Sequence, residues 1–78
     1  MQMTQIIEIL SDIRSGVDWA NEKDLIDNGL IDSFDMITLV NDLNEAFGTS
    51  IGLEHLEPEN FSSVEAIADL LRELGAAI

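Results

Sequence analysis

The sequence contains no cysteine and no long apolar run. Without thiols, the chain has no disulfide to stabilise it and no cysteine ligand for a metal ion. A membrane-spanning helix needs about 18 consecutive apolar residues, so we expect no membrane insertion. The first ten residues, MQMTQIIEIL, have no basic region and no small-residue cleavage site. We therefore expect no secretory signal and a cytoplasmic protein.

Basic residues are also scarce. Three Lys and Arg stand against 16 Asp and Glu, which gives a formal net charge of −13. Nucleic-acid binding is excluded as a function class, because phosphate contacts need clustered Lys and Arg. The 46% of hydrophobic residues argue against disorder. Two possibilities remain: a calcium-binding protein, or a protein that docks on the basic surfaces of partners.

The 78 residues are enough for one domain, 1–78, which we expect to be a monomer. Apolar residues recur at helical spacing in three stretches, 3–15, 33–47 and 63–74. Pro58 suits the first turn of a short helix near 57–61. Residues 16–32 have no sustained period and predict a long loop. No strand pattern competes, so we expect an all-α fold of three longer helices and one short one.

The stretch DLIDNGLIDSFD, residues 24–35, concentrates acids around a glycine. Aligned on Gly29, it approaches the EF-hand pattern D-x-[DN]-x-[DN]-G, with Asp24 first and Asp35 last. Ile26 supplies no oxygen where the pattern needs one, and no second loop pairs with this one. The loop would also run into the second predicted helix. An EF-hand-like calcium-binding interaction module is therefore kept as the alternative function.

Ser33 stands at the start of the second predicted helix. Its simplest interpretation is an N-cap, a role that it shares with Asp32. Nucleophilic catalysis would need a base, but the single histidine, His55, lies in the connector and no G-x-S-x-G motif is present. We therefore predict no enzymatic activity and assign no catalytic and no metal-binding residue. The connector residues Ile51, Leu53 and Leu56 are expected to reach the core.

A more specific pattern surrounds this serine. Asp32-Ser33-Phe34 is followed by Leu39, Val40, Leu43, Phe47 and Gly48 at the spacing L-V-x-x-L-x-x-x-F-G, and later by FSSVEAI at 61–67. In size, acidity and motif, the chain resembles the acyl carrier proteins and the related peptidyl carrier domains. The resemblance implies an acyl-carrier-like four-helix bundle with a long loop between helices one and two.

The resemblance also implies a function. Ser33 would carry a 4′-phosphopantetheine arm, installed from coenzyme A by a phosphopantetheinyl transferase that recognises Asp32. The arm's thiol would hold an acyl or aminoacyl group as a thioester and present it to loading and processing enzymes. Fatty-acid, polyketide and aminoacyl pathways all use this scaffold. Phe34 in place of the usual Leu, with Asn41 and Asn44 where acids are common, favours a specialised pathway.

One face of the second helix is the predicted partner surface. Helical geometry places Phe34 away from the core side, among polar residues. Acids on this face would meet Arg and Lys on partner enzymes and would govern association rate more than affinity. The partner-binding residues predicted in this way are Phe34, Asp35, Thr38, Asn41, Asp42 and Glu45.

Overall fold

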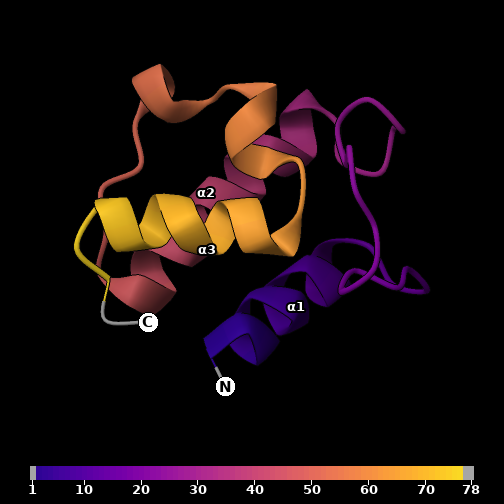
Figure 1. Cartoon of the computed structure of the whole chain (residues 1–78), viewed down its shortest axis with the longest axis horizontal. Helices are drawn as coiled ribbons and strands as arrows, with labels where there is room; N and C mark the ends of the chain where they lie inside the picture. Colours follow the sequence, from indigo (N-terminus) through magenta and orange to yellow (C-terminus); the bar gives the residue numbers. More distant parts are fainter. Residues whose placement is uncertain (1, 77–78) are drawn as a thin grey trace.

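The computed structural model describes residues 2–76, without the side chains of Gln2, Met3 and Leu53, so the predicted core position of Leu53 lies outside the described residues. Three α-helices and two 3-10 turns follow one another along the chain (Figure 1): α1 (Gln2–Ile13), α2 (Ser33–Phe47), η1 (Leu53–His55), η2 (Pro58–Phe61) and α3 (Val64–Glu73). Residues 2–76 contain no strand. The all-α prediction is confirmed over this range.

The helix bounds follow local signals. Helix α2 spans the predicted residues, because Asp32 caps its start and Gly48 ends it with a left-handed φ of 66°. Helices α1 and α3 lie within two residues of their predicted ends. Near residues 57–61, where a short helix was predicted, Pro58 opens a 3-10 turn. None of the helices within residues 2–76 is long and apolar enough to span a membrane.

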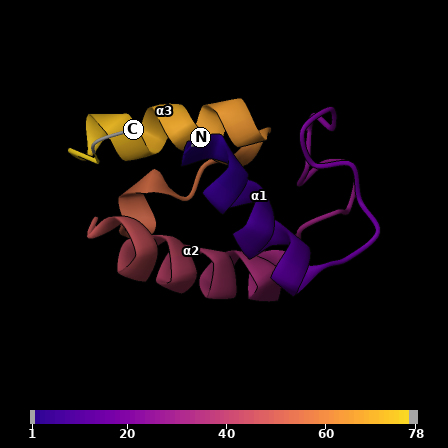
Figure 2. The same cartoon turned by 90° about the horizontal axis from the view of Figure 1, so that it is seen from below.

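Helix α1 packs against both α2 and α3, and α3 also packs against η2. Figure 2 shows α1 crossing between the other two helices. The three helices and η2 direct apolar side chains to a shared interior. The buried core consists of Ile6, Leu10, Trp19, Leu25, Ile31, Met36, Leu39, Leu43, Ile51, Phe61, Val64, Ile67, Ala68, Leu70 and Leu71.

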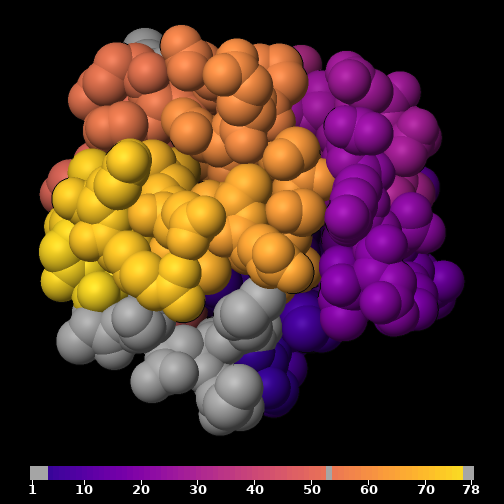
Figure 3. All heavy atoms as spheres, in the orientation of Figure 1, coloured from indigo at the N-terminus to yellow at the C-terminus, as the bar shows by residue number. Residues whose placement is uncertain are grey.

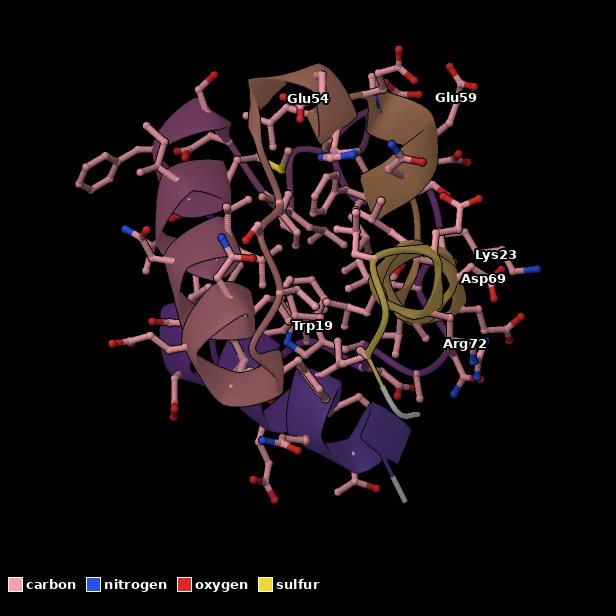
Figure 4. All side chains as sticks on the ribbon, turned by 90° about the vertical axis from the view of Figure 1, so that its left-hand side faces the viewer. Trp19, Lys23, Glu54, Glu59, Asp69 and Arg72 are labelled. Carbon is pink, nitrogen blue, oxygen red and sulfur yellow. The ribbon has the colours of Figure 1, made fainter. Side chains whose placement is uncertain are left out.

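The segment from 14 to 32 has turns but neither helix nor strand, yet it is anchored to the body. Trp19 is buried in the core (Figure 4), and its indole N–H donates to the Arg14 carbonyl at 3.3 Å. The Leu25 N–H donates to the Ser62 carbonyl at 3.2 Å. Figure 3 shows this segment lying against the chain that leads into α3. These contacts fix the approach to Asp32 and Ser33.

A side-chain clamp sets the path of the connector after α2. The Asn44 Oδ1 accepts hydrogen bonds from the Ile51 N–H at 2.8 Å and the Thr49 hydroxyl at 3.0 Å. Its Nδ2 donates to the Ile51 carbonyl at 3.4 Å. Because the amide both donates and accepts, it holds Ile51 in the core and turns the chain back toward η1 and η2.

Candidate functional site

The start of α2 is defined by a reciprocal cap between two acids. Asp32 has extended backbone and is the N-cap, and its Oδ1 accepts from the Asp35 N–H at 2.8 Å. The Asp32 N–H donates back to Asp35 Oδ2 at 3.5 Å. This capping box satisfies two of the four amides that a helix start leaves without an intrahelical partner. The cap belongs to Asp32 alone, and Ser33 is the first helical residue.

Ser33 is left exposed and unengaged by this arrangement. Its hydroxyl makes no hydrogen bond within residues 2–76. The amides of Ser33 and Phe34, in the first turn, likewise have no acceptor in the described chain. A helix N-terminus favours an anion by about 0.3–1 kcal/mol at an exposed position, which partly offsets repulsion from the Asp32 and Asp35 carboxylates. The serine is therefore a free hydroxyl beside two free amides.

An apolar groove of about 550 Å³ opens next to this hydroxyl. Its walls come from three segments that are far apart in the sequence: the loop before α2, the first turns of α2, and the chain around η2. The residues that line the groove are Ile26, Gly29, Ile31, Asp32, Ser33, Met36, Ile37, Leu56 and Pro58. A chain attached to Ser33 would therefore have an apolar surface along which to lie.

The outward face of α2 carries two large apolar side chains. Phe34 is 77% exposed and Ile37 is 59% exposed, the only large apolar side chains that are exposed among those described. Ile37 was not among the partner-binding residues predicted from the sequence. The sequence indicated that Ile37 is exposed with Phe34, because it lies three residues after Phe34 and therefore on the same side of the helix.

The predicted polar residues of this face are not all alike. Thr38, Asn41 and Glu45 are exposed, whereas Asp35 and Asp42 are half-buried. Asp35 is also a member of the capping box, so it has a structural task independent of any partner. Asn44, read in the sequence as a place where an acid was missing, is the clamp that holds Ile51.

The acidic stretch 24–35 does not form a set of metal ligands. No group of three or more His, Asp or Glu side chains gathers for a metal ion within residues 2–76. Its last three residues, Ser33 to Asp35, lie in α2, and Asp35 is engaged by Asp32. The calcium alternative gains no support from this geometry.

Comparison with known families identifies the family of the chain. The family described as a phosphopantetheine attachment site matches residues 4–71. The chain therefore belongs to this family of phosphopantetheine-binding carrier proteins, and the prosthetic group of the family is 4′-phosphopantetheine. No curated protein matches the chain closely enough to count as a relative.

Proposed function

We propose that this chain is a single-domain carrier, 1–78, that receives 4′-phosphopantetheine on Ser33. The observation that supports this choice most strongly is the capping box. Because Asp32 supplies the cap, the Ser33 hydroxyl is exposed and without a partner at the helix start. Modification of Ser33 would remove no hydrogen bond of the folded protein. The short helix predicted near residues 57–61 would correspond to the 3-10 turn η2.

The residues around Ser33 fit such a group. The amides of Ser33 and Phe34 would face its phosphodiester, as helix N-termini do with bound phosphates. The groove walls at Met36, Ile37 and Leu56 would contact its less polar part. When bound, the group supplies a thiol that carries an acyl or aminoacyl cargo as a thioester. This chain positions that thiol and performs no chemistry of its own.

The attachment reaction requires a separate transferase. The Ser33 Oγ forms a bond to the phosphorus of coenzyme A that carries pantetheine, and the pyrophosphate P–O bond breaks. Adenosine 3′,5′-bisphosphate leaves, and the hydroxyl proton passes to a base on the transferase. Asp32, exposed beside Ser33, is the residue that we propose the transferase recognises near its Mg²⁺.

The outward face of α2 is the proposed docking surface. Phe34 and Ile37 would enter an apolar recess on the partner, and Asp42 and Glu45 would meet Arg or Lys at its rim. Each exposed ion pair is worth only about 0–1 kcal/mol. The charges therefore speed and orient encounters without making release slow. Such a surface suits a carrier that visits a transferase, a loading enzyme and processing enzymes in turn.

The proposal is tested by intact mass. The protein is incubated with coenzyme A, Mg²⁺ and a broad-specificity phosphopantetheinyl transferase, and its mass is compared with that of an untreated sample. We expect a gain of one phosphopantetheine. A folded protein of unchanged mass, in a reaction where another carrier is modified, would reject the function. Calcium titration of wild type and Asp24→Ala would then test the alternative.

A further inference from the structure

The single histidine lies in the turn that leads to the groove. His55 ends η1, and the next residue, Leu56, lines the groove together with Pro58. The imidazole is 26% exposed, so it is half-buried and not a free surface side chain. The Gly52 N–H donates to its Nδ1 at 3.1 Å. This bond requires a lone pair on Nδ1, so the neutral ring carries its proton on Nε2.

The same nitrogen faces a carboxylate. Glu54 Oε1 lies 3.7 Å from Nδ1. The Glu54 carboxylate also lies over Gly52, where a Cβ built on the backbone would be 2.6 Å from Oε2. Gly52 needs an unprotonated Nδ1, whereas Glu54 attracts a protonated one. One atom thus stands between two neighbours with opposite requirements.

The surrounding charges do not add a competing partner. Within residues 2–76, Glu54 is the one carboxylate within 4.0 Å of the imidazole. Glu57 and Glu59, the next acids along the chain, lie at and within η2, outside that distance. The basic residues are placed elsewhere: Arg14 follows α1, Lys23 is in the loop before α2, and Arg72 pairs with Asp69 on α3 (Figure 4).

The backbone of His55 connects this atom to the groove wall. Its carbonyl accepts from the Glu57 N–H at 2.9 Å and from Asn60 Nδ2 at 2.9 Å. These two bonds enclose Leu56 and Pro58, which form one side of the groove beside Ser33. The ring that accepts from Gly52 and the backbone that borders the groove wall therefore belong to the same residue, His55.

We propose that Gly52, Glu54 and His55 form a proton-operated latch on the groove. With His55 neutral, the Gly52 N–H is bound and the wall at Leu56 is held. When Nδ1 gains a proton, it becomes a donor and turns to Glu54, and Gly52 loses its acceptor. The wall then loosens when His55 is protonated. The regulatory meaning of the latch rests on the proposed function, because the groove matters only if Ser33 carries a group.

The test is a pH titration of the whole chain followed by nuclear magnetic resonance. We expect the His55 ring, the Gly52 amide and the Leu56 methyl groups to change with one common midpoint. The protection factor of the Gly52 amide, which corrects for the intrinsic pH dependence of exchange, should fall about tenfold when its hydrogen bond is lost. The methyl groups of Leu10, in the core contributed by α1, serve as the unresponsive reference.

His55→Gln is the matched variant, because glutamine keeps an acceptor but does not titrate. In this variant the Gly52 and Leu56 signals should stay constant across the same range. A Gly52 amide that ignores His55 titration would overturn the latch, as would a constant Leu56 signal or an unchanged response in His55→Gln. No readout uses coenzyme A, so failure of the latch and failure of Ser33 modification are separately visible.

Discussion

Helices α2 and α3 begin with similar sequences, but the first apolar residues of α2 are exposed and those of α3 are buried. Each has a serine followed by apolar residues at the same spacing: Ser33 with Phe34 and Ile37, and Ser63 with Val64 and Ile67. Phe34 and Ile37 are 77% and 59% exposed, whereas Val64 and Ile67 are 2% and 0% exposed.

The cap residue explains the difference. In α3, Ser63 itself is the N-cap, and its hydroxyl accepts from the Ala66 N–H at 3.1 Å. In α2, Asp32 is the cap and Ser33 is already helical. Relative to the cap, the apolar pair of α2 therefore comes one residue later, which is about 100° around the helix. The start of α3 uses Ser63 as its cap and buries Val64 and Ile67. The start of α2 leaves Ser33, Phe34 and Ile37 exposed.

The largest expected difference concerns the two isoleucines. Ile67→Ala should lower the free energy of unfolding by about 2–5 kcal/mol, because it opens a cavity in the core. Ile37→Ala should change it by less than about 0.5 kcal/mol, as exposed substitutions do. Urea unfolding of both variants measures this. Equal losses would show that Ile37 is packed in solution and would remove it from the docking surface.

Replacing the α2 cap should have the next largest effect. Asp32→Ala removes the side-chain acceptor of the Asp35 N–H and should destabilise the protein by about 1–2 kcal/mol in urea unfolding. Asp32→Asn keeps a side-chain acceptor and should recover most of that loss. Slower modification of a stable Asp32→Asn variant would then isolate the role of the charge in transferase recognition. Wild-type stability in Asp32→Ala would mean that another group caps α2.

The exposed apolar pair should affect partners more than folding. Phe34→Ala combined with Ile37→Ala should lower kcat/KM for transferase modification about tenfold, which corresponds to ~1.4 kcal/mol of lost contact. The melting temperature should hardly change. Glu73→Ala, an exposed substitution on α3, is the control and should react like wild type. An unchanged rate in the double variant would contradict the assignment of this face to the transferase.

The two serines should differ by a smaller amount in stability. Ser63→Ala removes a cap and should cost about 1 kcal/mol, while Ser33→Ala should stay within about 0.5 kcal/mol of wild type. Thermal unfolding of the two variants under the same conditions makes the comparison. A loss in Ser33→Ala as large as that in Ser63→Ala would mean that the Ser33 hydroxyl is engaged after all.

The sequence predicted features that depend on local signals. The bounds of α2 follow from Asp32 and Gly48, and the proposed attachment residue follows from the Asp-Ser motif at that helix start. What it missed depends on tertiary contacts. The role of Asn44 depends on Ile51, which lies seven residues later.

The correction at Asn44 changes one functional argument. An acid at this position would lack the donor that reaches the Ile51 carbonyl. Asparagine there has a structural explanation, so it no longer favours a specialised pathway. That interpretation now rests on Phe34 and Asn41, the first strongly exposed and the second exposed without a structural bond in the described chain.

The measurement that tests the central claim most directly locates the modification among the serines. Wild type, Ser33→Ala and Ser63→Ala are treated with coenzyme A, Mg²⁺ and transferase, and the products are fragmented for tandem mass spectrometry. We predict phosphopantetheine on Ser33 in wild type and in Ser63→Ala, and none in a folded Ser33→Ala. Phosphopantetheine on any other serine, or continued modification of Ser33→Ala, would contradict the account.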